Sequence, residues 1–165
     1  MKTALLKAAL LAATVVPGIA VAHPSVEVRF ADPTHFTDLR YTTSDDERDA
    51  ARLADYLRIY LERRAPAHLP QGKRLDVTIT DVDMAGELRP SSRSIYMLRR
   101  VVRGVYPPRV DLEFRLVNAD GTVEREGRRE LRNSAFLTSR FAQRHTPLAH
   151  EEALLERWLR TEFTR

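Results

Sequence analysis

The chain of 165 residues contains no cysteine. Disulfides, thiolate metal sites and cysteine nucleophiles are therefore excluded. Lysine is almost absent beyond the first 22 residues, where Lys73 is the only one, so nearly all of the positive charge there is arginine. The chain also has no glycine-rich phosphate loop, no dinucleotide fingerprint and no Gly-x-Ser-x-Gly frame around its serines. The chain therefore lacks the common signatures of nucleotide-binding enzymes and serine hydrolases.

The one long apolar stretch lies at the N-terminus. Two lysines precede an apolar run at 8–16, and Pro17-Gly18 ends the run. The run is shorter than the about 20 residues that a membrane-spanning helix needs. Ala20-Val21-Ala22 matches the small-x-small pattern of a cleavage site. We therefore predict a cleaved signal peptide at 1–22, cleavage near Ala22, and a periplasmic or secreted mature protein without a transmembrane segment.

The predicted mature chain, residues 23–165, has the length of one ordinary domain. Its 143 residues are enough to bury a hydrophobic core without disulfides. Loss of the two N-terminal lysines lowers the formal net charge from +4 to +2. Apart from its N-terminal segment, the chain has no second long hydrophobic stretch, no repeat and no low-complexity linker. We expect a single domain of unknown function.

Hydrophobic periodicity predicts the main elements of this domain. Apolar and polar residues alternate at 26–30, 75–80 and 110–116, which predicts three strands. Asp120-Gly121 favours a tight hairpin, so the highly charged stretch 122–131 is expected to return as an exposed or edge strand. Residues 84–109 are harder to assign, and 95–105 could be a short strand or an irregular loop.

Two helices complete the pattern. Ser44 and Glu47 form a capping-box pattern ahead of apolar residues that recur at helical spacing as far as Leu61. Thr146 and Pro147 predict the start of a last helix with an apolar side. We therefore expect an α+β fold of two layers, in which a mostly antiparallel sheet of about four strands carries two helices on one face, in the order β-α-β-β-β-α.

Four stretches of the chain together resemble a known family. They are "VEVRFADPTHFTDLR", "LDVTITDVDMAGE", "VYPPRVDLEFRLVNADGTVEREGRREL" and "EEALLERWLRTEF". In content and order they resemble bacterial exported proteins grouped as domain of unknown function 3016. The resemblance covers essentially the whole predicted mature chain and implies a signal-bearing envelope protein of one domain. It implies no activity and no catalytic residue.

The carboxylates in "TITDVDMAGE" are the first candidate site. If the strand at 75–80 simply continued, Asp81 and Asp83 would point into the core, where an unpaired carboxylate costs several kcal/mol. Three explanations remain open. The strand ends or bulges at Thr80, the aspartates pair with an arginine such as Arg109, or Asp81, Asp83 and Glu87 hold a cation.

The pattern around these carboxylates departs from known metal sites. A calcium loop needs further oxygen ligands at the fifth and twelfth positions, where this chain has Ala85 and Ser92. His145 and His150 are five residues apart, whereas two zinc ligands on one helical turn are roughly three or four apart. We expect no cofactor.

The second candidate site is a run of positive charge. No acidic residue occurs between Glu87 and Asp111, whereas six arginines do. Arginine binds phosphates and carboxylates through two parallel hydrogen bonds, and tyrosines interleave with the arginines here. The candidate ligand-binding residues are Tyr96, Arg99, Arg100, Arg103, Tyr106 and Arg109. The alternative is that these arginines neutralise nearby acids of the same domain.

These features favour a binding or accessory module over an enzyme, although activity is left open. The expected partner is an anionic component of the cell envelope or another protein, and no nucleic acid is expected outside the cytoplasm. The competing hypothesis is a metal-binding protein or metal-dependent hydrolase centred on the three carboxylates.

Overall fold

The computed structural model describes residues 25–40, 46–91, 94–138 and 146–164, and for residues 46 and 94–97 it describes the backbone alone. The predicted signal peptide and the predicted cap at Ser44 lie outside these residues. Six strands are present: β1 Ser25–Phe30, β2 Arg74–Asp83, β3 Glu87–Ser91, β4 Ser94–Val101, β5 Arg109–Val117 and β6 Val123–Arg132. The two α-helices are α1 Asp46–Arg64 and α2 Ala149–Phe163, and the short 3-10 helices are η1 Pro33–His35, η2 Ala65–His68 and η3 Phe136–Thr138.

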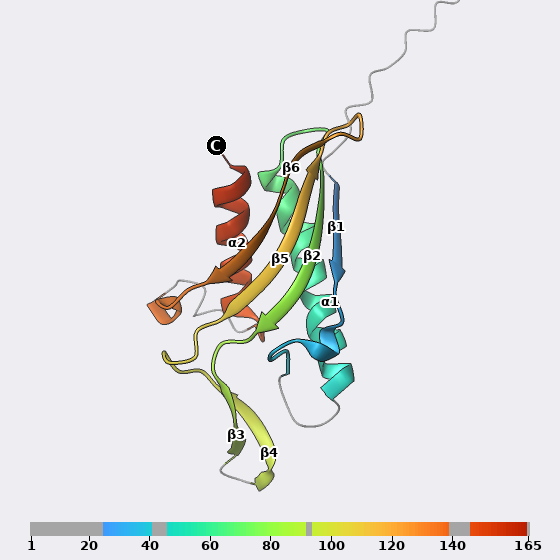
Figure 1. Cartoon of the computed structure of the whole chain (residues 1–165). Helices are drawn as coiled ribbons and strands as arrows, with labels where there is room; N and C mark the ends of the chain where they lie inside the picture. The colour runs from blue at the N-terminus through green and yellow to red at the C-terminus, as the bar shows by residue number, and fades with distance from the viewer. Residues whose placement is uncertain (1–24, 41–45, 92–93, 139–145, 165) are drawn as a thin grey trace, which may run out of the picture.

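Four strands form the main sheet in the order β1-β2-β5-β6. The helix α1 connects β1 to β2, and these two strands are parallel, whereas β2, β5 and β6 pair antiparallel. Both helices lie on one face of this sheet (Figure 1). The structure confirms the α+β fold with four strands and two helices. It also confirms β6 as the charged edge strand, reached through a turn in which Gly121 has a φ of 86°.

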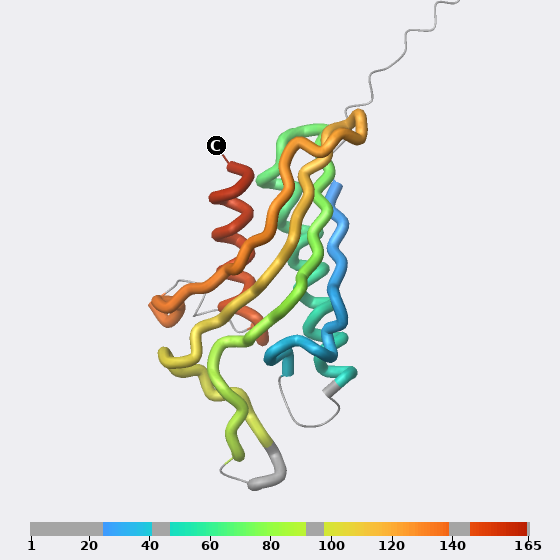
Figure 2. The backbone as a smooth tube through the Cα atoms, in the orientation of Figure 1, coloured from blue at the N-terminus to red at the C-terminus, as the bar shows by residue number. Residues whose placement is uncertain are grey.

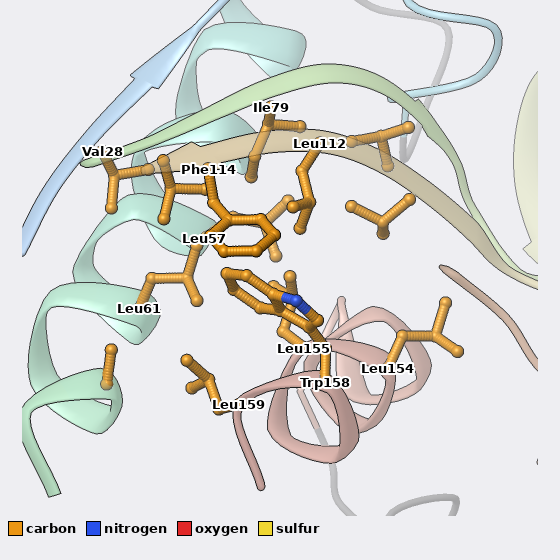
Figure 3. Close-up of a cluster of buried hydrophobic side chains, with 14 of the residues drawn as sticks. Val28, Leu57, Leu61, Ile79, Leu112, Phe114, Leu154, Leu155, Trp158 and Leu159 are labelled. Atoms are coloured by element: carbon orange, nitrogen blue, oxygen red, sulfur yellow. The ribbon is translucent and has the colours of Figure 1, made fainter. Parts of the chain in front are cut away.

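The core lies between the sheet and the two helices. Alternate residues of β2 and β5 point toward the helices because successive side chains of a strand face opposite sides. Phe114 of β5 meets Trp158 and Phe163 of α2 edge-on, with ring centroids 5.7 and 5.6 Å apart. Leu57 and Leu61 of α1 are fully buried in the same cluster (Figure 3). This packing covers one face of the main sheet, and charged side chains occupy the other face.

The start of α2 differs from the sequence-based prediction. The helix begins at Ala149, with Leu148 at the N-cap position and no side-chain cap, so the predicted start at Pro147 with Thr146 as cap is wrong. The hydroxyl of Thr146 instead donates to Oε1 of Glu152 at 3.1 Å. Leu148 is fully buried, which shows that packing of this residue takes precedence over the favourable capping chemistry of threonine.

The segment that the sequence left unassigned forms a second, two-stranded sheet of β3 and β4. We call this hairpin the arm. Figure 2 shows that the chain leaves the end of β2, runs through the arm and returns to β5, and that the arm projects beyond the end of the main sheet. The arm adds two strands to the expected order. It carries part of the arginine-rich segment beyond the end of the main sheet, whereas Arg109 lies in β5.

Candidate functional site

The end of β2 explains why aspartates follow an apolar strand. The pairing of β2 with β5 shifts register between Ile79 and Asp81, which is a β-bulge. The bulge changes which residues face the core, so Val82 is fully buried and Asp81 turns away from the helices. The strand therefore bulges after Ile79 and continues to Asp83 without burying an unpaired carboxylate.

Asp81 is held by two neighbouring segments. The backbone N–H and the hydroxyl of Thr37 each donate to its carboxylate at 2.6 Å. Arg109 donates to Oδ2 of Asp81 at 2.5 Å and, through its other terminal nitrogen, to Asp111 at 2.5 Å. Burial alone would raise the pKa of Asp81, but the hydrogen bonds from Thr37 and Arg109 outweigh it and lower this pKa. Pairing of Asp81 with Arg109 is one of the explanations that the sequence left open.

Asp83 lies beside a second arginine-bound carboxylate. Asp38 forms a β-bridge with Asp83, and its N–H donates to the carbonyl of Val82 at 2.9 Å. Burial raises the pKa of Asp83, Arg109 opposes this effect, and the negative charges of Asp38 and Asp81 add to it. Three partly buried carboxylates, those of Asp38, Asp81 and Asp83, therefore share two arginines, Arg100 and Arg109.

Arg100 is the most enclosed charge in this region. Its side chain is 4 % exposed and donates to both carboxylate oxygens of Asp38 at 2.8 Å. It also donates to the carbonyl oxygen of Arg40 at 2.6 Å and, at longer distances, to those of residues 84–86. One guanidinium therefore joins β4 to the segment after η1 and to the segment after β2. We call this group the inner cluster: Thr37, Asp38, Asp81, Asp83, Arg100, Arg109 and Asp111.

A buried acid of α2 borders the inner cluster. Glu151 is 1 % exposed, and the N–H of Ala85 donates to its Oε1 at 2.8 Å. Burial raises the pKa of Glu151 to about 7, although the hydrogen bond from Ala85 and the charge of Arg100 lower it. This contact attaches the start of α2 to the base of the arm.

Glu87 belongs to a different group of residues. Its carboxylate accepts a hydrogen bond from Nε of Arg89 at 2.6 Å and lies 3.8 Å from Nη1 of Arg103. The hydrogen bond from Arg89 lowers the pKa of Glu87, and Tyr106 adds a smaller contribution in the same direction. Arg99 is exposed and stands directly opposite Arg89 in the register of the arm. We call Glu87, Arg89, Arg99, Arg103 and Tyr106 the outer arginine face.

The base of the arm depends on a glycine. Gly86 has a φ of 83°, and its N–H donates to the carbonyl oxygen of Tyr106 at 3.0 Å. A Cβ at this position would meet the carbonyl oxygen of Val101 and lie 2.7 Å from Cα of Val102. Only glycine fits both the left-handed conformation and the close approach of the two chain segments. The segments that enter and leave the arm are therefore held close together at its base.

The bare face of the main sheet provides a contrast. Its charges alternate in sign across strands, as in Arg115 with Glu126 at 3.4 Å and Arg128 with Glu113 at 3.8 Å. Opposite charges on facing strands satisfy one another. On the outer arginine face, Arg89 and Arg103 interact with the one described carboxylate, Glu87, and Arg99 adds a third positive charge opposite Arg89, so the described part of this face carries an excess of positive charge.

The structure divides the residues that the sequence singled out. Arg99, Arg103 and Tyr106 lie on the outer arginine face with Glu87, whereas Arg100 and Arg109 bind the aspartates of the inner cluster. Tyr96 lies in β4, but the structure does not describe its side chain, and Arg93 lies outside the residues that the structure describes. The inner arginines have little surface on which to bind an anion from solution.

A zinc site in a protein has at least three protein ligands at one place. Within the described ranges, no group of three or more His, Asp or Glu side chains is placed to hold a metal ion. Asp81 and Asp83 share the neighbourhood of Arg109, whereas Glu87 has Arg89 and Arg103 as partners. No helix in the described part of the chain is both long and apolar enough to cross a lipid bilayer.

Comparison with known families decides the classification. The model of the family described as "Protein of unknown function (DUF3016)" matches residues 24–161. The chain belongs to this family. In the DUF3016 chain, the matched range includes the main sheet, the arm and nearly all of α2. Comparisons with curated proteins and with solved structures give no match.

Sequence reasoning missed several residues of these groups. Thr37 and Asp38 come from a loop that carries no pattern of its own, and Glu151 resembles any acid in the first turn of a helix. Arg89 was visible as a member of the arginine run. Its position opposite Arg99 could be recognised only after the two strands of the arm were paired.

Proposed function

We propose that this protein is an exported binding module without catalytic activity, which recognises an anionic component of the cell envelope or an acidic face of a partner protein. The N-terminal sequence pattern supports export, with cleavage near Ala22. The ligand face in this proposal is the outer arginine face. A rigid body with a projecting arm is well suited to present such a surface.

The pairing of Arg89 with Arg99 across the arm carries the proposal. Like charges directly opposite each other on two strands destabilise a hairpin. Glu87 offsets part of this repulsion through Arg89, and Arg103 lies farther from the same carboxylate. A bound phosphate or carboxylate would supply the missing negative charge and hydrogen-bond acceptors.

A thermal-shift assay tests this function. A ligand that binds only the folded chain raises the melting temperature by mass action, because it stabilises the folded state by about 2.7 kcal/mol at a hundredfold excess over its dissociation constant. The probes are lipopolysaccharide fragments for an envelope component and polyglutamate for an acidic protein face. Divalent cations, with and without EDTA, test the competing metal hypothesis.

Two matched variants assign the effect to the arm. Arg99→Gln/Arg103→Gln removes two charges from the outer arginine face, and Arg157→Gln/Arg160→Gln removes two exposed charges from α2. We expect an anionic probe to stabilise the wild type and the α2 variant, and to have much less effect on the arm variant. The proposal fails if neither anion raises the melting temperature, or if the two variants lose the effect equally.

A further inference from the structure

Exposed apolar side chains gather at the base of the arm. Among the described residues, seven large apolar side chains are exposed, and four of them lie in the loop from β4 to β5 or in η3. We call these four the apolar shoulder: Val102, Val105, Tyr106 and Leu137. Val105 is 75 % exposed and Leu137 is 50 % exposed, which is far more than packing against the body would leave.

The two segments of the apolar shoulder are neighbours in space. A Cβ added to Gly104 would lie 3.5 Å from Cδ1 of Leu137, so the loop and η3 are in contact. Figure 2 shows this loop and η3 next to each other, on the side of the molecule where the arm leaves the sheet. The shoulder is therefore one surface, although its residues are more than thirty positions apart in the sequence.

The apolar shoulder merges with the outer arginine face. Tyr106 belongs to both, and Arg103 lies in the loop between Val102 and Val105 with its side chain half exposed. The 23 residues between Glu87 and Asp111 contain six arginines and no acid. Arg100 and Arg109 of this segment belong to the inner cluster, but Arg89, Arg99 and Arg103 still outnumber Glu87 on the outer arginine face. A surface with an excess of positive charge beside short apolar side chains and a tyrosine has the chemistry of an interfacial membrane contact.

We propose that the arm docks on an anionic lipid bilayer, with the arginines of the outer arginine face against headgroup phosphates and the apolar shoulder in the boundary between headgroups and acyl chains. This inference rests on the proposed function and names its ligand. A projecting arm can approach a deformable lipid surface without a complementary cleft. The excess of positive charge on the outer arginine face, where Glu87 is the one described acid, matches the repeated negative charge of such a bilayer better than the mixed polar rim of a protein interface does.

Vesicle binding tests the inference directly. Each variant is expressed as the full chain and purified from the same cell fraction. All variants then carry the same N-terminus. Vesicles of phosphatidylcholine alone are compared with vesicles that contain about 30 % phosphatidylglycerol, because only the latter carry negative charge. We expect binding to the anionic vesicles, little binding to the neutral vesicles, and weaker binding as salt increases.

Two pairs of variants separate charge from apolar contact. Arg99→Gln/Arg103→Gln should weaken partitioning into anionic vesicles about 30-fold, since each arginine near such a surface contributes about five- to sixfold. Arg157→Gln/Arg160→Gln is the charge-matched control. Val105→Ser should weaken partitioning about fivefold, whereas Ile59→Ser, which removes an exposed apolar side chain of α1, should not.

The outcomes distinguish this inference from the proposed function. Equal binding to neutral and anionic vesicles, or no binding to either, overturns the membrane inference. If a soluble anion then still stabilises the wild type more than the arm variant, the proposed function stands, with a soluble or protein ligand. If no anion stabilises the wild type either, both proposals fail.

Discussion

Arg99 and Arg100 are neighbours in β4, yet their environments are opposite. Arg100 is almost fully buried and donates to Asp38 and to backbone carbonyls, whereas Arg99 is exposed and faces another arginine across the arm. The same contrast separates the inner cluster from the outer arginine face as a whole. Adjacent residues of a strand point to opposite sides, so one segment can provide structural charges on one side and available charges on the other.

The difference teaches that a run of arginines is not one functional unit. The arginines of the inner cluster neutralise acids of the same domain, as one of the sequence-based alternatives held. The outer arginines exceed the acids within their reach, which is the condition for binding an external anion. Predictions that separate the two sides therefore test the interpretation of the whole segment.

The largest expected effect is the loss of Arg100. Arg100→Gln removes the guanidinium that donates to both carboxylate oxygens of half-buried Asp38, leaves it only the more distant Arg40 at 3.9 Å, and removes donors from several carbonyl oxygens. Breaking a buried charge pair from one side costs about 3–5 kcal/mol. Arg99→Gln should change the free energy of unfolding by less than about 0.5 kcal/mol, because Arg99 is exposed. Urea denaturation measures both, and equal losses would contradict the division into two sides.

Glu151 makes the inner side sensitive to pH. Burial raises its pKa to about 7 in the folded chain, whereas the reference value of 4.5 applies when the chain unfolds. The folded chain therefore keeps a proton that the unfolded chain releases as the pH rises. The stability contributed by this proton is fully present below pH 4.5 and is lost as the pH rises through about 7.

Glu151→Gln tests this linkage because glutamine resembles the protonated acid at every pH. From the shift in pKa, the wild type should lose on the order of 3 kcal/mol of stability between pH 4.5 and 8 through this group. The variant should lack this part of the decline while keeping an acceptor for the N–H of Ala85. Melting temperatures across the pH range check the expectation, and parallel profiles for the two chains would refute it.

Gly86 lies at the base of the arm, and its substitution gives a smaller effect. Gly86→Ala introduces a Cβ into the backbone of Val101 and Val102 and also strains a residue with positive φ. Gly121→Ala has the same strain, but no atom lies within 4 Å of its added Cβ. We expect a loss of about 1 kcal/mol for Gly121→Ala and about 3 kcal/mol for Gly86→Ala. Thermal unfolding measures the difference, and equal losses would mean that the two segments at the base of the arm do not approach each other this closely at Gly86.

The sequence predicts the helix-covered body of the protein well, because burial of one side of a strand or helix makes apolar residues recur at a regular spacing. Leu75, Val77 and Ile79 alternate with polar residues, and β2 runs where they predict. The connection of β1 to β2 through α1 fits their parallel pairing, which a pattern of single residues does not specify. The start of α2 was misplaced because capping preferences are weaker than the burial of Leu148.

The arm could not be predicted in the same way, and a strand that ends or bulges at Thr80 was only one of three explanations that the sequence left open for the aspartates. The arm lies outside the core, so its strands carry no apolar alternation that reveals them. The bulge after Ile79 changes the register by a single residue, and the sequence shows only its consequence, a polar residue where an apolar one is expected. Once the arm is known to be a hairpin, the opposite directions of Arg99 and Arg100 follow from the strand period.

The central claim is that Arg100 is occupied inside the protein, whereas Arg99 and Arg103 are available to a ligand. Nitrogen-15 NMR of the arginine Nε–H groups tests it in the free chain and during titration with pyrophosphate. In the structure, Nε of Arg100 donates to the carbonyl oxygen of Arg40 at 3.2 Å. We predict slow proton exchange at Arg100 with no response to pyrophosphate, and fast exchange at Arg99 and Arg103 with shifts on titration. Equal exchange at all three arginines, or a response at Arg100 alone, would contradict the account.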